Sequence, residues 1–360
     1  MDYAVDPDIT VASTIDSAFY HDEDAFELAR ERIFARSWQW IGDLGDVAAP
    51  GSLSPRGFLP GILDEPLLLS RDGTGELRCL SNVCTHRGNI LVRESCTKVD
   101  QIRCGYHSRR FDLSGRMTFM PEFAEARNFP APSDDLPRIP FGAWADHGFA
   151  ALDPAAPLDA FLGDTKKRLA WLPLERFRFD PASSRDYTVA AHWALYIENY
   201  LEELHIPFVH PGLSKLVDCA AYEHELFRYS SLQLALAREG EVAFDTPPRA
   251  SDHGRRVAAY YWWIFPNLML NFYPWGLSLN RVVPEAVDRT RVEFRACVWD
   301  EDKRGLGAGG ALHEVELEDE AVVEAVQRGV RSRFYRHGRY SPTRERGTHH
   351  FHRLLCEFMR

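Results

Sequence analysis

The sequence predicts an α+β protein with two domains, a small β-rich domain followed by a larger domain built around an antiparallel sheet. In the first half, short apolar runs such as Leu67–Ser70 and Leu77–Leu80 alternate with glycine, proline and aspartate turns at the spacing of strands. Farther along, strand-like runs rich in valine and aromatic residues occupy the region 220–299, with helical patterns on either side. At 360 residues the chain is long enough for two hydrophobic cores.

The order of these elements suggests the domain boundaries. An amphipathic pattern over 22–40 predicts a helix, so residues 1–40 are expected to form an N-terminal helical segment that packs on the larger domain. Residues 41–152 should form the β domain, and the proline-containing stretch Asp153–Pro157 marks its end. The larger domain, 153–360, carries three further helical patterns, at about 158–172, 192–206 and 319–336.

Composition narrows the classes of partner and compartment. The net charge of −11 argues against nucleic acid and anionic membranes, which both attract basic surfaces. No run of about 18 apolar residues occurs, and the N-terminus lacks the basic and apolar pattern of a signal peptide. The predicted compartment is therefore the cytoplasm. In that compartment cysteines are reduced thiols or metal ligands, and five of the seven are expected to be structural thiols: Cys79, Cys96, Cys219, Cys297 and Cys356.

Two short motifs in the β domain have the residues of a metal cluster. They are Cys84-Thr85-His86 and Cys104-Gly105-Tyr106-His107, with seventeen residues between His86 and Cys104. Each offers one thiolate and one imidazole, so two facing loops can give both sulfurs to one iron and both imidazoles to the other. That is the ligation of a Rieske [2Fe–2S] centre. A structural zinc site is the alternative, but its usual order of two cysteines followed by two histidines does not fit.

The residues around these ligands resemble a known family. Cys84–Asn89, Cys104–His107 and the following Phe111–Gly115 look like the Rieske domain of ring-hydroxylating and related oxygenases. The chain departs from that family in one place. Where members commonly have Gly-Trp after the second histidine, this chain has Ser108-Arg109, which affects the packing and potential of the cluster rather than its ligands.

A second constellation lies in the predicted helix 192–206. Asn199, Glu202 and His205 are spaced i, i+3, i+6 and would share a helical face, while His210 follows five residues after His205. Pro207 lies between the two histidines and should disrupt the helix, so that both imidazoles can converge. Two histidines and one carboxylate form the facial triad of non-heme Fe(II) oxygenases, which leaves positions open for O2 and substrate.

The resemblance extends to this segment and implies the third ligand. Asn199 to His210 is similar to the mononuclear-iron motif of the same family, in which an aspartate on a later helix precedes a glutamine by a fixed distance. That spacing, measured from Gln327, selects Asp319, with Glu318 and Glu320 as close alternatives.

The resemblance also implies roles for Asn199 and Glu202 among the catalytic residues. The carboxylate at position 202 is usually Asp in the family and links the two metal sites between neighbouring subunits. Glu at this position resembles the branch that oxidises choline, betaine and carnitine. The adjacent Glu203 is interpreted as an ordinary exposed helical glutamate.

Taken over nearly the whole chain, the resemblance implies an N-terminal Rieske β domain followed by a helix-grip (START/SRPBCC-like) catalytic domain with an antiparallel sheet. The implied activity is that of a terminal oxygenase. Electrons from a separate reductase or ferredoxin, which alone binds NAD(P)H and flavin, pass through the cluster to Fe(II), and oxygen from O2 enters a small organic substrate. That substrate is an aromatic compound or a quaternary amine, and the implied assembly is a homotrimer.

Other interpretations stay open at this point. The chain could be a Rieske electron carrier with a non-catalytic C-terminal domain, or a zinc-stabilised binding protein. The aromatic run 260–275 is expected mainly to fill the core, with alternate side chains available to line a substrate cavity. The histidine-rich segment 349–352 is expected to pack rather than bind metal, and the glycine-rich segment 305–310 is expected to be a loop.

Overall fold

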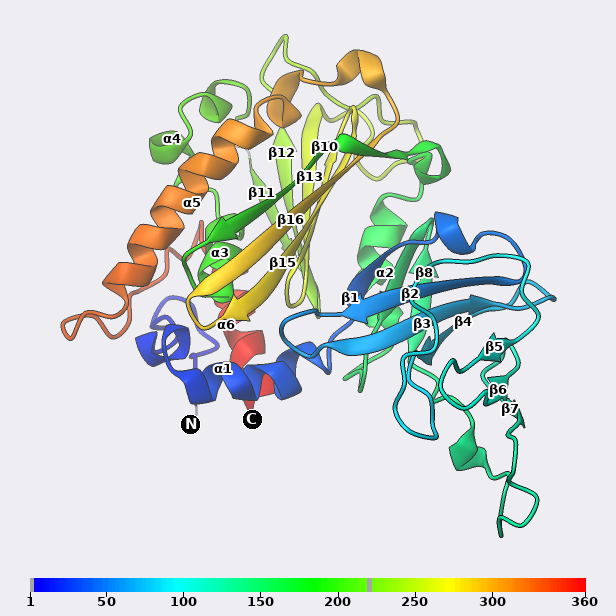
Figure 1. Ribbon diagram of the computed structural model, residues 1–360. Helices are drawn as coiled ribbons and strands as arrows, with labels where there is room; N and C mark the ends of the chain where they lie inside the picture. The colour runs from blue at the N-terminus through cyan, green and yellow to red at the C-terminus, as the bar shows by residue number, and fades with distance from the viewer. Residues whose placement is uncertain (1–2, 219–221) are drawn as a thin grey trace. The chain divides into compact units, whose positions relative to one another are not determined.

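The computed structural model describes residues 3–218 and 222–360 (Figure 1), so the expectation for Cys219 lies outside the described residues. The chain forms two compact units, one of Ala35–Ala155 and one of Met1–Phe34 together with Ala156–Arg360. Both are built on antiparallel sheets, and helices accompany the sheet of the larger unit, which confirms the predicted α+β class. None of the described helices is both long and apolar enough to cross a bilayer.

The smaller unit contains three antiparallel sheets of three strands each. Their orders are β1-β9-β8, β2-β3-β4 and β5-β6-β7. The strands are β1 (Gln39–Asp43), β2 (Ser52–Phe58), β3 (Glu65–Arg71), β4 (Leu77–Ser81), β5 (Ile102–Arg103), β6 (Arg110–Phe111), β7 (Met117–Phe119), β8 (Phe141–Trp144) and β9 (His147–Ala150).

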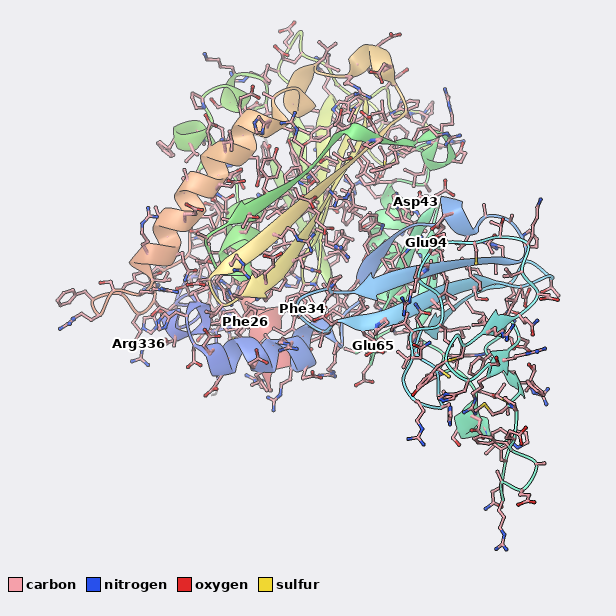
Figure 2. The ribbon with its side chains drawn as sticks, in the orientation of Figure 1. Phe26, Phe34, Asp43, Glu65, Glu94 and Arg336 are labelled. Atoms are coloured by element: carbon pink, nitrogen blue, oxygen red, sulfur yellow. The ribbon has the colours of Figure 1, made fainter. Side chains whose placement is uncertain are left out.

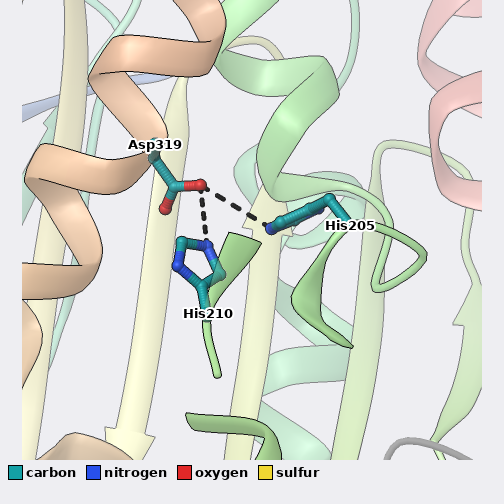
Figure 3. A group of neighbouring side chains, drawn as sticks. All are labelled: His205, His210 and Asp319. Carbon is teal, nitrogen blue, oxygen red and sulfur yellow. Dashed lines mark hydrogen bonds and ion pairs between the residues drawn. The ribbon is translucent and has the colours of Figure 1, made fainter. Parts of the chain in front are cut away.

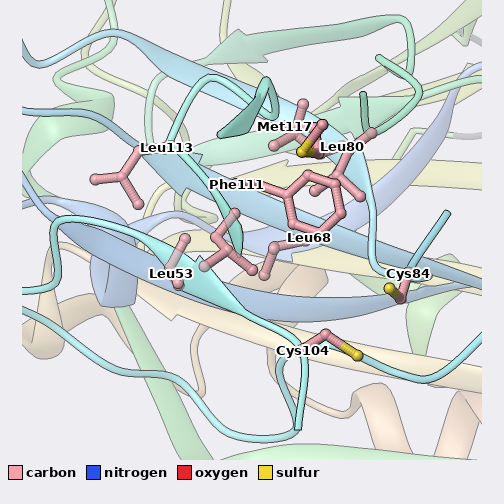
Figure 4. Close-up of a cluster of buried hydrophobic side chains, with 10 residues drawn as sticks. Leu53, Leu68, Leu80, Cys84, Cys104, Phe111, Leu113 and Met117 are labelled. Carbon is pink, nitrogen blue, oxygen red and sulfur yellow. The ribbon is translucent and has the colours of Figure 1, made fainter. Parts of the chain in front are cut away.

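The core of this unit includes the two cysteines of the predicted cluster. Cys84 and Cys104 are each 2% exposed and pack with the apolar side chains of β2, β3, β4, β6 and β7 (Figure 4). Among these, Leu68, Leu80 and Phe111 are fully buried. The loops that carry the cysteines are therefore anchored in a packed core, which favours a defined position for both sulfurs.

The larger unit is organised around one seven-stranded antiparallel sheet of order β10-β16-β15-β14-β13-β12-β11. Its strands are β10 (Arg178–Val189), β11 (Glu223–Leu226), β12 (Ser230–Leu236), β13 (Val257–Ile264), β14 (Leu268–Tyr273), β15 (Gly276–Ala286) and β16 (Arg289–Val298). The helices are α1 (Glu23–Ala29), α2 (Leu158–Arg168), α3 (Trp193–Tyr200), α4 (Ile206–Val209), α5 (Leu312–Gly329) and α6 (Arg346–Met359).

Side chains of the aromatic strand β13 alternate between the two faces of this sheet, as the period of a strand requires. The Tyr260 hydroxyl donates to Asp252, which also accepts two hydrogen bonds from Arg168 of α2. Its neighbour Tyr261 points to the other face and contacts Tyr200 of α3. Helix α2 and helix α3 therefore cover opposite faces, and α5 runs beside α3 (Figure 1).

The N-terminal segment packs within the larger unit. Asp22 caps α1 by accepting from the backbone of Asp24 and Ala25, and a π-helical turn, Arg30–Phe34, continues it. Phe26 and Phe34 (Figure 2) contact His192 and Trp193 at the start of α3.

Two of the predicted helices begin or end elsewhere than expected. The helix expected over 192–206 ends at Tyr200, because Leu201 is the last residue whose N–H bonds back into the helix. The helix expected over 319–336 is α5, which begins at Leu312 and ends at Gly329. Its acidic residues 318–320 therefore lie in the middle of the helix rather than in a first turn.

Candidate active site

The two cysteine-histidine loops have the same backbone hydrogen bonds. The N–H of Cys84 donates to Asn89 O at 2.9 Å, and that of Gly88 donates to Cys84 O at 3.0 Å. In the second loop the N–H of Cys104 donates to Arg109 O at 2.8 Å, and the N–H of Ser108 donates to Cys104 O at 3.1 Å. The loops are thus two copies of one conformation and present their side chains in the same way.

The four side chains fit a [2Fe–2S] cluster with two kinds of iron. The thiols of Cys84 and Cys104 are buried, while the rings of His86 and His107 are half-exposed and lie 4.7 Å apart between centroids. The Nδ1 atoms of both imidazoles are buried and have no hydrogen-bond partner among the described residues. Each of these atoms is therefore free to bind metal. A zinc site needs its ligand atoms to converge on one ion, and among the described residues these four side chains do not form such a group.

Hydrogen bonds to one sulfur stabilise its thiolate form. The Cys104 sulfur accepts from Asn89 Nδ2 at 3.6 Å and from the N–H of Tyr106 at 3.5 Å. Burial raises the pKa of the Cys104 thiol, but the backbone N–H groups of Tyr106 and His107 together with the side chains of Cys84 and Asn89 outweigh burial, so the net shift is downward. Such donors also raise the reduction potential of an iron–sulfur centre.

The departure at Ser108-Arg109 has a structural explanation. Ser108 has φ = 60°, the left-handed conformation that its counterpart Gly88 adopts at φ = 70°. Arg109 is 2% exposed, forms a 2.5 Å ion pair with Asp134 and lies over the rings of Phe111 and Phe129. Arg109 is thus held as a buried cation against two rings, and a buried cation requires a partner such as Asp134.

The second constellation forms at the two ends of the single-turn helix α4. His205 precedes the helix and His210 follows it, while Asp319 projects from α5 (Figure 3). Oδ1 of Asp319 lies 3.0 Å from Nε2 of His210 and 3.6 Å from Nε2 of His205. One ligand atom from each of the three residues lies within 4.8 Å of the others, which fits a facial triad.

The expected role of Pro207 is wrong. It does not break a helix between the two histidines but lies in the first turn of α4, where proline is favoured. The break occurs earlier, at Glu202, whose carboxylate accepts the backbone N–H groups of Leu204 and His205. Glu202 therefore does not share a helical face with His205. It caps the turn that carries this histidine.

Each triad histidine has a carboxylate on its other ring nitrogen. Nδ1–H of His205 donates to Glu202 at 2.5 Å, and Nδ1–H of His210 donates to Glu318 at 2.6 Å. Such partners fix the ring tautomer so that Nε2 can face a metal. Of the three acidic candidates, Asp319 lies with the imidazole nitrogens, Glu318 orients one of them, and Glu320 makes neither contact.

The carboxylates of Asp319 and Glu318 favour the protonated form of His210. Burial lowers the pKa of His210, but the hydrogen bonds and charges of Asp319 and Glu318 outweigh burial and raise it. A proton and a divalent metal ion compete for the same lone pair, so metal binding here should release a proton.

The interpretation of Glu203 as an exposed surface residue is wrong. It is 2% exposed and pairs with His224 and with Arg344, the latter at 2.9 Å. Since α3 ends at Tyr200, Glu203 lies in the turn and points into the protein rather than away from a helix. This buried ion-pair cluster ties the turn to β11 and to the segment before α6.

A second tie fixes the position of α5. The Gln327 side chain accepts the backbone N–H of His192 at 2.8 Å and donates to the carbonyl of Tyr20 at 3.2 Å. The amide thereby sets the register of α5 against the start of α3, which places Asp319 opposite α4. This is a physical reason for a fixed spacing between that aspartate and the glutamine.

A cavity of about 110 Å³ opens beside the triad. Its floor is the sheet face that holds Tyr261, which lies directly between Gln233 and Asn271 on the adjacent strands. Asn199 lines it as well. Its remaining aromatic and acidic lining consists of Tyr196, Tyr200, Tyr222, Tyr273, Phe294, Glu202, Glu316 and Asp319.

Glu316 was not identified from the sequence. It is 3% exposed, and its Oε2 accepts a 2.6 Å hydrogen bond from the Tyr196 hydroxyl. Burial, followed by the charges of Asp319 and Glu320, raises its pKa to about 8 against the opposing hydrogen bond. The available signal was its spacing, since it precedes Asp319 by three residues on one helix and so shares its face.

Comparison with known proteins decides the family. Residues 174–360 match the ring hydroxylating alpha subunit (catalytic domain), and residues 37–130 match the Rieske [2Fe–2S] domain. The chain belongs to the ring-hydroxylating alpha-subunit family. This Rieske oxygenase is thus a terminal oxygenase subunit with a [2Fe–2S] cluster and a mononuclear iron, as predicted. A catalytic-domain match over half of the chain disfavours an electron carrier with a non-catalytic second domain.

Curated relatives and solved structures cover nearly the whole Rieske oxygenase chain. The carnitine monooxygenase oxygenase subunit of Escherichia coli (strain K12) is 29% identical over 96% of this chain and 94% of its own length. Chloroplastic choline monooxygenase of Arabidopsis thaliana is 29% identical over 97% and 84%.

The fold is shared with solved structures of lower identity. A quaternary ammonium Rieske monooxygenase, described with inter-subunit electron transfer and carnitine oxidation, superposes with a TM-score of 0.79 at 23% identity, covering 99% and 100% of the two chains. Naphthalene 1,2-dioxygenase from Rhodococcus sp. has a TM-score of 0.75 at 20% identity, covering 96% and 94%.

The equivalence of Gly88 and Ser108 makes a stability prediction for the Rieske oxygenase. Ser108→Gly should stabilise the cluster domain by about 0.5–1 kcal/mol, because glycine removes the left-handed strain but adds freedom to the unfolded chain. The matched change is Gly88→Ser, which should destabilise the domain by a similar amount through the left-handed backbone alone. A Cβ at Gly88 meets no atom within 4 Å, so no steric clash adds to that strain. The measurement is the urea midpoint for loss of the visible cluster absorbance. Equal midpoints for all three proteins would show that these positions are not strained.

Proposed function

We propose that this oxygenase oxidises an organic amine cation rather than a neutral aromatic ring. The observation that carries this proposal is the lining of the cavity beside the triad. Its described residues include five tyrosines and three carboxylates, and none of them is a lysine or an arginine. Tyrosine faces and carboxylates attract a cation, while a neutral ring gains nothing from the carboxylates. The names of two relatives, carnitine monooxygenase and choline monooxygenase, agree with this substrate class.

The proposed roles follow from the geometry. Cys84 and Cys104 hold one iron of the cluster, and His86 and His107 hold the other. Donors of the mononuclear iron are His205, His210 and Asp319. With two external electrons and two protons, one oxygen atom of O2 enters a C–H bond of the substrate and the other leaves as water. The iron supplies the activation of O2, and the residues of the chain bind, orient and hold protons.

Glu202 is proposed to connect the metal centres. One of its oxygens accepts the Nδ1 proton of His205, which fixes this ring, and the carboxylate also lines the cavity. In a homotrimer, a cluster histidine of the neighbouring subunit could donate to the same carboxylate. Electrons are proposed to reach the cluster from a separate reductase or ferredoxin, since no segment of this sequence predicts a nicotinamide or flavin site.

The substrate class is tested by coupled turnover. With a surrogate reductase and NADH, choline, glycine betaine and carnitine should be assayed beside benzoate and naphthalene. We expect oxidised product and coupled O2 consumption from at least one amine and none from the aromatic compounds. Product from an aromatic compound alone would overturn the proposal.

The iron ligands are tested by Asp319→Ala. Iron content should fall from about three to about two atoms per chain, because the triad loses its only negative ligand, while the visible cluster spectrum stays intact. The matched variants are Glu320→Ala, which should change neither quantity, and Glu318→Ala, which should weaken iron binding by about 10- to 100-fold through loss of the Nδ1 partner. Full iron content and activity in Asp319→Ala would assign the ligand role to a neighbouring glutamate.

The bridging role is tested by Glu202→Gln. Both metal centres should assemble and dithionite should still reduce the cluster, but product in a single turnover should fall by about 100-fold or more, because the charge that orients the hydrogen-bonded histidines is gone. Glu202→Asp should retain part of the activity.

Glu318→Gln is the matched control for this prediction. It also changes a carboxylate on the Nδ1 of a triad histidine, yet once iron is saturating it should keep single-turnover product. Normal product in Glu202→Gln would return this residue to the role of a local cap.

A further inference from the structure

One buried carboxylate in the cavity has no part in the proposed metal chemistry. Leu312, Val315, Glu316 and Asp319 line the cavity from α5 at the spacing i, i+3, i+4, i+7, which is one face of the helix. Glu316 is therefore one turn from the proposed iron ligand. It belongs to neither of the carboxylate–imidazole pairs that hold the triad.

Only half of this carboxylate has a partner. Tyr196 donates to Oε2, whereas Oε1 is buried and accepts no hydrogen bond from residues 3–218 and 222–360. A buried carboxyl oxygen without a hydrogen-bond partner is costly whether or not it carries the proton, and in native proteins such atoms are nearly always satisfied by the protein or by a bound molecule such as water. Because Glu316 lines the cavity, the missing donor can come from a molecule bound there.

The charged groups around Glu316 indicate that the bound molecule is a cation. The charged groups that raise its pKa are Asp319 and Glu320, both acidic. The described lining holds no lysine or arginine to balance them, and its only basic side chains are the triad imidazoles His205 and His210. Burial and these charges hold a proton on the carboxyl, since its pKa is raised to about 8. A cation that entered the cavity would stabilise the ionised form and displace that proton.

We propose that Glu316 is the counter-ion for the ammonium group of the substrate and that its Oε1 accepts an N–H from it, so that the site favours protonated secondary or tertiary amines over quaternary ones. This rests on the proposed oxidation of an amine cation. A quaternary nitrogen carries the same charge but no N–H, and it would leave Oε1 buried without a donor. The difference is the hydrogen bond and not the charge.

The rest of the cavity suits the methyl groups of such an amine. The Tyr200 hydroxyl already donates to Asn271 at 2.6 Å, so this residue offers its ring rather than a donor. Tyr261 and Tyr273 meet at 5.9 Å between centroids in an edge-on arrangement and extend the aromatic wall. An ammonium held at Glu316, one helical turn from Asp319, would place its N-methyl or adjacent methylene C–H bonds toward the triad.

Three molecules of nearly equal shape separate charge from hydrogen bonding. They are dimethylaminoethanol, which is protonated at about pH 7 and has an N–H, choline, which is quaternary, and dimethylbutanol, the neutral carbon isostere of choline. Their dissociation constants should be measured by calorimetry on the holoenzyme with both metal centres loaded. The variants are Glu316→Gln, which keeps the acceptor for Tyr196, and the control Glu314→Gln, an exposed change on the same helix.

In the wild type we expect dimethylaminoethanol to bind about tenfold more tightly than choline, and choline more tightly than dimethylbutanol. Glu316→Gln should remove the advantage of dimethylaminoethanol over choline, weaken both cations and leave dimethylbutanol unchanged, while Glu314→Gln should reproduce the wild type. Tighter binding of choline in the wild type, or the same ratio of the two cations in Glu316→Gln, would overturn the inference and leave the proposed function standing. If neither cation binds more tightly than dimethylbutanol in the wild type, the proposed function fails with it.

Discussion

The catalytic site depends on the pairing of each triad imidazole with a carboxylate that is not itself in the triad. Glu202 and Glu318 hold the Nδ1 atoms of His205 and His210, so that both Nε2 atoms face Asp319. Without those bonds, two imidazoles at the ends of a four-residue helix would be free to rotate. Two further contacts keep the histidines in this orientation. The ion pairs of Glu203 with His224 and Arg344 hold the turn before α4, and the hydrogen bond of Gln327 with His192 holds α5 against the start of α3.

The side chains of the two cysteine-histidine loops are positioned by the backbone rather than by carboxylate partners. Here the proposed ligands are fixed by backbone geometry, with one hydrogen-bond pattern used twice and a left-handed residue in each copy. A left-handed serine is tolerated at position 108 because buried Arg109 and its Asp134 partner pin the chain directly after it. The charge of Arg109 also lies close to the loop, so a departure from the family pattern changes the electrostatics of the cluster while the ligands stay the same.

Much of this could be predicted from the sequence because ligands and their spacing are local features. The four proposed cluster ligands, the two histidines and Asp319 of the proposed triad all fall on short motifs, and the strands of the larger sheet show the alternation of Tyr260 and Tyr261. What could not be predicted depends on distant contacts. Where α3 ends follows from Glu202 capping the next turn, and the burial of Glu203 follows from His224 and Arg344, which are far away in sequence. The hydrogen bond between Glu318 and His210, which lie 108 residues apart in the sequence, could not be predicted either.

Part of the acidic net charge of the chain lies at the iron site. Asp319, Glu202, Glu318 and Glu316 bring four carboxylates to one region, against the two positive charges of an Fe(II) ion. With all four ionised the region keeps a net negative charge, and with Glu316 protonated that excess is smaller by one. The protonation state of this single residue therefore sets how strongly the loaded site attracts a cation. Because Glu316 is buried beside other acids, its ionisation is favourable chiefly when a positive group is next to it, and substrate charge and cavity charge are then coupled through one proton.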